Sequence, residues 1–403
     1  MSRSGLPAAI MTRTTLGTGC APRVAAARAL DGWEMKVAVY AIAKDEAAHV
    51  ERWLAAVADA DLVVVADTGS RDDTVARLRT GGASVHEVEV RPWRFDVARN
   101  RALALVPEDV DACFSLDLDD LPQPGWRAAV EAAWTPGVTR LHYRYVIGHG
   151  PDGEPEIEHA RTKIHARRGY HWEHAVHEEV APDDPAAEVV APCAARVDHH
   201  PDPAKSRDAY LPLLELAVVE EPEQSQHAFW LGREYVYRGR WDQAVAELAR
   251  YLALPEAVWP PERAAAMRFL AQASAALGRQ GEAEAWLLRA CAEAPDEREP
   301  WVDLAQNCHN AQDWAGGFAA ARRALAITER PHHYLTTPIA WGERADDLAA
   351  VCAWWLGLSD TAREHVVAAL RAAPNDLRII ANARFMGATG LATVGLHPSN
   401  ESS

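Results

Sequence analysis

The C-terminal half of the chain repeats itself at a fixed distance, and this repeat limits the fold more than any other sequence feature. From about Asp208 the sequence is rich in alanine and has the apolar spacing of helices. Small residues return 34 residues later at three positions: Ala271 and Ala305, Ala283 and Gly317, and Ala290 and Ala324. Small residues at fixed places let two helices approach closely, so this period predicts stacked pairs of helices.

The 34-residue spacing is that of tetratricopeptide repeats, and we expect such repeats over residues 208–386. Residues 231–248 form an earlier unit, residues 362–374 a degenerate fourth one, and the loop at 259–263 is expected to hold an insertion. We expect Trp301, Leu304 and Trp314 to fill the gaps between helices. Repeats of this kind offer a concave surface for a peptide, or for a second subunit in a homo-oligomer.

The N-terminal half instead alternates short apolar strands with helices. The expected strands are residues 37–42, 62–66, 84–90 and 112–116. We expect Asp45 to cap the first helix, and Ser70 to Asp73 to form a capping box for the second. Repeated strand–helix units predict a doubly wound α/β layer in which the ends of successive strands converge on one crevice.

The fourth strand leads into a stretch with three carboxylates, Asp117, Asp119 and Asp120. Alternation in an extended segment would point Asp117 and Asp119 to the same side, where they would repel each other unless a cation lies between them. Mg²⁺ and Mn²⁺ take oxygen ligands and commonly share a site with nucleotide phosphates. A solvated turn after a buried strand is the alternative.

Four ordered motifs carry a resemblance to glycosyltransferase family 2, in the subset whose catalytic domain is followed by tetratricopeptide repeats. They are residues 41–46 (AIAKDE), 63–74 (VVVADTGSRDDT), 95–100 (FDVARN) and 115–120 (SLDLDD). The resemblance covers roughly residues 36–203. It implies a GT-A fold with a Rossmann-like mixed sheet, a nucleotide diphosphate sugar as donor, Mn²⁺ or Mg²⁺ at the Asp-x-Asp motif, and net inversion at the anomeric carbon.

The resemblance also implies roles for single residues. Asp67 matches an aspartate near the nucleobase, Ala41 lies where the backbone contacts the base, and Arg99 matches a basic residue near the nucleotide. Asp117 would face the ribose or the waters of the metal, and Asp119 would bind the metal directly. Taken alone, Asp67 could cap its own turn and Arg99 could be a surface charge.

Two further segments complete the expected site. An inverting transfer needs a base, and we choose Glu178, with Glu179 as the alternate; alternation would place the two on opposite faces, and His177 is a candidate to orient the base. We assign His199 as a further metal ligand, with His200 as its competitor. The histidines between 165 and 177 match no zinc spacing, and we expect no zinc there.

The composition of the chain limits the binding partners and the cellular compartment that we expect. A net charge of −17 argues against sequence-independent binding to a nucleic-acid backbone. The six cysteines form no CxxC pair, no apolar run reaches the length of a membrane span, and a cytoplasmic protein with reduced thiols is expected. We expect a disordered leader at 1–34, a catalytic domain at 35–207, the repeats at 208–386 and a disordered tail at 387–403.

The leading hypothesis is an inverting, metal-dependent glycosyltransferase that moves a sugar from a nucleotide diphosphate sugar to a peptide, protein or glycan acceptor. Uridine is the default nucleobase by resemblance. The alternative is a catalytically inactive nucleotide-sugar-binding scaffold for protein–protein interaction. A nucleotidyltransferase is disfavoured, because the first strand is not followed by a glycine-rich, lysine-bearing phosphate loop.

Overall fold

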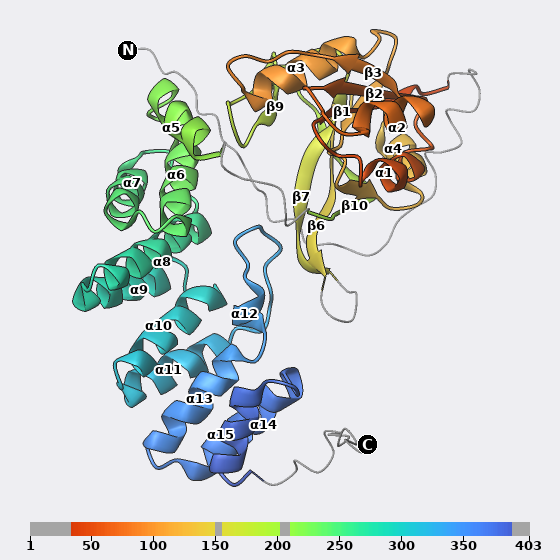
Figure 1. Ribbon diagram of the computed structural model, residues 1–403. Coiled ribbons are helices and arrows are strands. Elements are labelled where there is room, and N and C mark those ends of the chain that lie inside the picture. Colours follow the sequence, from red (N-terminus) through yellow and green to blue (C-terminus); the bar gives the residue numbers. More distant parts are fainter. Residues whose placement is uncertain (1–33, 150–154, 202–209, 389–403) are drawn as a thin grey trace, which may run out of the picture. The chain divides into compact units, whose positions relative to one another are not determined.

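The computed structural model describes residues 34–149, 155–201 and 210–388 (Figure 1). The expected leader, apart from Glu34, and the expected tail beyond Ala388 lie outside the described residues. The described residues from Lys36 onward belong to one compact unit, which combines a mixed β-sheet with a series of helices.

The N-terminal part is built on an eight-stranded mixed sheet with the order β3-β2-β1-β4-β7-β6-β10-β5. Strands β1 to β4 run parallel, β7 is antiparallel to both β4 and β6, and β5 is antiparallel to β10. The bounds are β1 (Val37–Ala43), β2 (Leu62–Asp67), β3 (Ser84–Glu87), β4 (Ala112–Ser115), β5 (Asp120–Pro122), β6 (Arg140–His149), β7 (Pro155–Ala166) and β10 (Val190–His199). A separate two-stranded sheet pairs β8 (Tyr170–Glu173) with β9 (Glu179–Pro182).

Helices cover both faces of the parallel strands. On one face, α3 (Phe95–Leu105) and β8 pack against Ala38 and Tyr40 of β1 in a shared apolar core. On the other, Trp126 of α4 (Trp126–Ala133) lies against Phe114 and donates a hydrogen bond to Ala56 of α1 (Val50–Ala56). The remaining elements are α2 (Thr74–Thr80) and the 3-10 helix η2 (Pro185–Ala187). Successive residues of a strand point to opposite faces of the sheet. Because both faces of these strands are covered, the strands are apolar throughout.

Two expected helix caps are wrong. Asp45 lies five residues before α1 in the left-handed region (φ 54°), and its carboxylate accepts a hydrogen bond from the backbone of Arg71. Ser70 donates to Asp67 instead of capping α2, whose N-cap residue, Asp73, makes no side-chain cap. Both side chains stabilise the loop after β2 rather than a helix end, because that loop has its own unpaired backbone N–H groups to satisfy.

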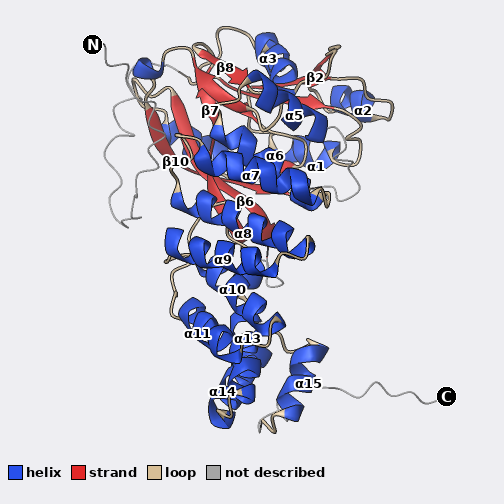
Figure 2. Cartoon of the chain, turned by 90° about the vertical axis from the view of Figure 1, so that its left-hand side faces the viewer, coloured by secondary structure: helices blue, strands red, loops and turns tan. Residues whose placement is uncertain are grey.

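The C-terminal part is a series of helices that follow one another as packed pairs (Figure 2). They are α5 (Tyr210–Glu220), α6 (Ser225–Tyr237), α7 (Trp241–Ala253), α8 (Pro260–Ala276), α9 (Gln280–Glu293), α10 (Arg298–Asn310), α11 (Trp314–Leu325), α12 (Pro338–Trp341), α13 (Arg344–Trp355), α14 (Ser359–Ala372) and α15 (Leu377–Phe385). Among the described residues, no helix is long and apolar enough to cross a membrane.

The small residues of the repeat lie where one helix meets the next. All three pairs of recurring residues are buried in α8 to α11, as the period predicted. Leu304 is buried, Trp301 packs on the same core, and Trp314 stacks on Trp355. The insertion lies where it was expected but is helical instead of a loop: Pro260 to Arg263 form the first turn of α8, which has 17 residues where α6 and α10 have 13.

Gly232 allows a close approach between α6 and α7. A Cβ added to Gly232 would lie 2.6 Å from the side chain of Leu248, which is fully buried. A Cβ on Gly281, in the first turn of α9, would meet nothing within 4 Å.

We therefore expect Gly232→Ala to lower the free energy of unfolding by about 1–3 kcal/mol, because overpacking a closed helix contact forces the neighbours apart. The matched variant Gly281→Ala gains helix propensity without a clash, and should be neutral or stabilising by up to about 1 kcal/mol. Thermal unfolding followed by circular dichroism measures both. An equal melting temperature for the two variants would contradict this account of Gly232.

Candidate functional site

The carboxyl ends of three parallel strands bring the expected residues to one edge of the sheet. Strand β1 lies between β2 and β4, so the loops after Asp67 and Ser115 flank the end of β1. Ala41 is fully buried in β1 and pairs with Val65. In open α/β sheets this edge is where ligands bind.

Asp67 organises the loop that follows its own strand. Its carboxylate accepts hydrogen bonds from the backbone N–H groups of Gly69 and Ser70, each at 3.0 Å, and from the Ser70 hydroxyl at 2.5 Å. Gly69 has φ 104°, a conformation that L side chains rarely adopt, so the turn depends on glycine there. In this conformation Asp67 caps its own turn, and its expected role near a nucleobase stays a prediction.

Arg99 is a buried bridge and not a surface charge. Its guanidinium, on α3, lies 2.9 Å from the carboxylate of Asp117 and 2.5 Å from that of Glu178. It also lies over the indole of Trp172, 4.9 Å from the ring centroid. Burial opposes its charge, but the Asp117 and Glu178 carboxylates outweigh that effect and raise the pKa of Arg99. One cation thus holds two acidic side chains from distant segments.

A second cation, which the sequence did not single out, lies beside Asp117. Lys163 of β7 has its ammonium 3.7 Å from the Asp117 carboxylate and its side chain is mostly buried. Burial, and then the nearby Arg99 charge, lower the pKa of Lys163. No motif marks Lys163, because it is brought to the site by the antiparallel pairing of β7 with β4.

The acidic stretch divides into two groups. The expected alternation is wrong, because β4 ends at Ser115 and a turn follows, closed by a hydrogen bond from the backbone N–H of Asp120 to the carbonyl of Asp117. Asp117 therefore faces Arg99 and Lys163, whereas Asp119 and Asp120 approach His199. Asp117, expected to face the ribose or the waters of the metal, and Asp119, expected to bind the metal directly, therefore lie on different sides of this turn.

Asp119, Asp120 and His199 form a candidate metal centre. Each offers a donor atom within 4.8 Å of the others, and His199 Nδ1 lies 2.9 Å from Asp120 Oδ1 and 3.8 Å from Asp119 Oδ1. Strand β10 pairs His199 opposite Asp120 of β5, and Tyr145 donates a 2.7 Å hydrogen bond to the same Asp120 oxygen. Burial lowers the pKa of His199, but the hydrogen bond and charge of Asp120 outweigh it and raise the pKa overall. The sequence motifs predicted Asp119 and His199 as metal ligands, but gave Asp120 no role in metal binding.

His200 belongs to the wall of a neighbouring pocket. Its ring stacks on His149, with 5.9 Å between centroids, while its backbone N–H donates to the Asp119 carbonyl. The pocket has a volume of about 490 Å³ and is lined by Ala48, His49, Arg52, Ile147, Gly148, His149, His199, His200 and Pro201. Its one arginine and four histidines give this pocket one fixed positive charge and several imidazole nitrogens next to the metal centre.

The two glutamates considered as a base lie differently. Glu178, in the loop between β8 and β9, is mostly buried against Arg99. Glu179 is the first residue of β9, is exposed, and pairs with Glu173. His177, the candidate to orient the base, stacks on the ring of Trp230, with 4.6 Å between the ring centroids. Of the two glutamates, only Glu178 lies at the described cluster of charges.

The comparisons with known proteins concern the helical half. A family model described as Tetratricopeptide repeat matches residues 229–298. These residues form tetratricopeptide repeats. The match spans α6 to α9, and α10 and α11 continue the same 34-residue spacing.

Several solved structures are similar to part of this chain. A crystal structure of MamA is 17% identical, covers 42% of this chain and 91% of its own, and has a TM-score of 0.35. YrrB, described as a TPR protein with an unusual peptide-binding site, is 12% identical over 44% of this chain and 83% of its own, with a TM-score of 0.35. TTC0263, a thermophilic TPR protein of Thermus thermophilus, is 20% identical over 44% of this chain and 89% of its own, with a TM-score of 0.33. No curated protein matches the chain.

The Arg99 bridge yields a prediction about stability. Arg99→Met leaves Asp117 and Glu178 without their shared cation, and should lower the free energy of unfolding by about 2–4 kcal/mol. The exposed pair Arg144–Glu158 is the control, and Arg144→Met should cost less than about 1 kcal/mol. Chemical denaturation of both variants measures the difference. Equal losses would show that the bridge is no stronger than a surface ion pair.

The candidate metal centre yields a second prediction. Asp119→Asn and His199→Gln each remove one donor and should weaken Mn²⁺ binding at least ten-fold in isothermal titration calorimetry. Glu179→Gln removes the same charge from an exposed position and should leave Mn²⁺ affinity within two-fold of the unmodified protein. Unchanged Mn²⁺ affinity in Asp119→Asn would contradict the site.

Proposed function

We propose that the sheet-containing part is an inverting, divalent-metal-dependent glycosyltransferase of the GT-A type, similar to family 2. It would move a sugar from a nucleotide diphosphate sugar, UDP-linked by default, to a peptide, protein or glycan acceptor. The observation that carries the proposal is the division of the acidic stretch: a carboxylate–imidazole centre at Asp119, Asp120 and His199, and beside it Asp117, Arg99 and Glu178.

The donor set of the candidate metal centre fits Mn²⁺. Two carboxylates and one imidazole offer the mixed oxygen and nitrogen ligands that Mn²⁺ accepts, whereas Mg²⁺ prefers oxygen alone. Asp119, Asp120 and His199 would hold the ion. When bound, it would neutralise the charge that develops on a departing diphosphate.

The protein's own residues supply the other requirements. Arg99 and Lys163 provide positive charge around Asp117, and Arg52 provides one more positive charge in the pocket on the other side of the metal centre. A diphosphate needs such fixed positive charge, which acts strongly in a partly buried site. Glu178 would take the proton from the acceptor hydroxyl, and Arg99 holds its carboxylate in place beside the site.

The helical half would serve the acceptor. Tetratricopeptide repeats are typical of proteins that bind protein partners, through the concave surface that their helix pairs create. We propose that this surface holds a peptide or protein acceptor, or a second subunit, while the sheet-containing part acts on the sugar.

The scaffold alternative has an observation in its favour. Glu178 is bound to Arg99 at 2.5 Å and its side chain is only 11% exposed, so its carboxylate already has a structural role in the loop. A nucleotide-sugar-binding protein in which Glu178 only braces the loop would show the same contacts.

Measurements of donor binding and of turnover distinguish the glycosyltransferase from the inactive scaffold. We expect UDP-sugars with Mn²⁺ to raise the melting temperature more than UDP-sugars alone, because a ligand of the folded state stabilises by about 2.7 kcal/mol at 100 times its Kd. GDP- and dTDP-sugars run in parallel identify the base. If none of the three donors shifts the melting temperature with Mn²⁺, the proposed donor class is wrong.

Glu178→Gln then tests the base. It should bind the donor as tightly as the unmodified protein but release free nucleotide diphosphate, with water as acceptor, about 10²–10⁴-fold more slowly. Glu179→Gln should keep the full rate. Donor binding without release of nucleotide diphosphate in the unmodified protein would favour the scaffold.

A further inference from the structure

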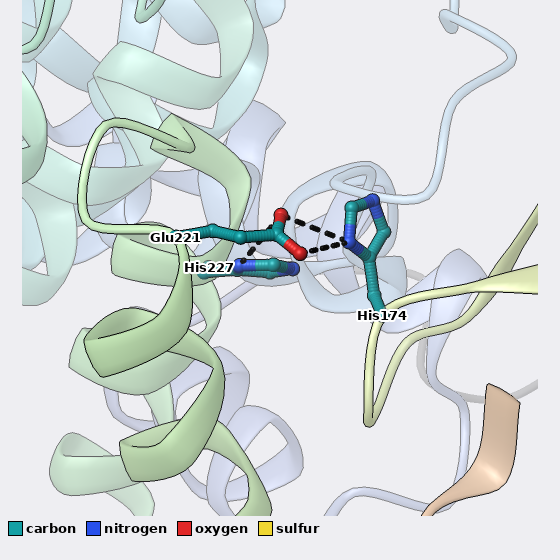
Figure 3. A group of neighbouring side chains, drawn as sticks. All are labelled: His174, Glu221 and His227. Carbon is teal, nitrogen blue, oxygen red and sulfur yellow. Dashed lines mark hydrogen bonds and ion pairs between the residues drawn. The ribbon is translucent and has the colours of Figure 1, made fainter. Parts of the chain in front are cut away.

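A second group of metal-binding side chains lies away from the acidic stretch. His174, in the loop between β8 and β9, meets Glu221, directly after α5, and His227, in the first turn of α6 (Figure 3). Their donor atoms all lie within 4.8 Å of one another. We propose that His174, Glu221 and His227 bind a zinc ion, independently of the proposed transferase activity.

The distances suit a small tetrahedral ion. His174 Nδ1 lies 3.1 Å from Glu221 Oε2, and His227 Nδ1 lies 3.8 Å from the same oxygen. Ligands at about 2.0–2.1 Å from zinc in tetrahedral geometry are about 3.3 Å apart, between these two values. Two imidazoles and one carboxylate are an established zinc donor set that leaves a fourth position for water. The partly exposed Glu221 carboxylate gives that position access to solvent.

His227 supplies the independent observation. Its side chain is 2% exposed, and its Nδ1 has no hydrogen-bond partner among the described residues. At 3.8 Å the Glu221 oxygen is too far for a hydrogen bond. A buried polar nitrogen without a partner is destabilising, and an ion between His227 and Glu221 would satisfy it.

The other nitrogen of His227 is already placed for this role. The backbone of Ala217 is an acceptor for the imidazole, and because Nδ1 has no hydrogen-bond partner we assign this contact to Nε2. Metal-binding histidines usually donate their second N–H to such an acceptor, which fixes the tautomer. Burial lowers the pKa of His227 and so favours the neutral imidazole.

Apolar packing holds the three ligands in place. Ala175 and Val176, next to His174, share one core with Ala228 and Phe229, next to His227, and with Leu214 of α5. The rings of His174 and His227 meet edge to face, with 4.5 Å between centroids. The ligands are thus brought together by the fold itself, and zinc would fasten the β8–β9 loop to α5 and α6.

The test uses the full chain, stripped with a chelator and then titrated with ZnSO₄. Glu221→Gln changes a partly exposed side chain and is expected to fold; His174→Gln and His227→Gln remove the other ligands. His365→Gln is the matched control, because His365 pairs with Asp346 at 2.7 Å outside both three-donor groups of the described residues. Each variant is also made in the Asp119→Asn background, which removes a donor from the other metal centre.

We expect one zinc ion to bind in the Asp119→Asn protein, measured by elemental analysis, and to raise its melting temperature. Glu221→Gln and His174→Gln should weaken this binding at least ten-fold and abolish the thermal shift, whereas His365→Gln should change neither. Co²⁺ in place of zinc should give the visible absorption of a tetrahedral site. The proposal is overturned if the Asp119→Asn protein binds no zinc, or if Glu221→Gln binds zinc as tightly as His365→Gln.

Discussion

The buried guanidinium of Arg99 is the interaction on which the site depends. A charged group at this depth is tolerated only when opposite charges compensate it. Arg99 meets this need with Asp117, from the turn after β4, and with Glu178, from the loop between β8 and β9. Three segments far apart in the sequence are thereby held at one place, and the proposed base is positioned before any ligand arrives. The same ion pair also restrains the side chain of Glu178.

The turn after β4 determines how the acidic residues are used. Three carboxylates within four positions of the chain would repel one another if they shared one environment. The turn sends Asp117 toward the cations Arg99 and Lys163, and leaves Asp119 and Asp120 with His199. Two cations, Arg99 and Lys163, therefore lie beside the acidic stretch in a chain whose net charge is −17.

The loop between β8 and β9 belongs to both halves of the protein. Glu178 contacts Arg99 on α3, while His177, one residue earlier, stacks on Trp230 of α6. Ala175 and Val176 lie in the apolar core of the first helices. This short loop therefore contacts both the helices and the site that contains Glu178.

The sequence by itself determined the elements and their periodicity: the apolar strands before Asp67 and Asp117, and the 34-residue spacing of small residues that the tetratricopeptide match confirms. These patterns are local. Residues on one face of a strand recur at every second position, and residues on one face of a helix recur at every third or fourth position. Only the tertiary structure decided which distant side chains meet. The register of β5 and β10 brought Asp120 to His199, and apolar packing brought His174 to Glu221 and His227. Residues that meet in this way have no characteristic spacing in the sequence, because strand pairing and packing between distant segments determine their contacts.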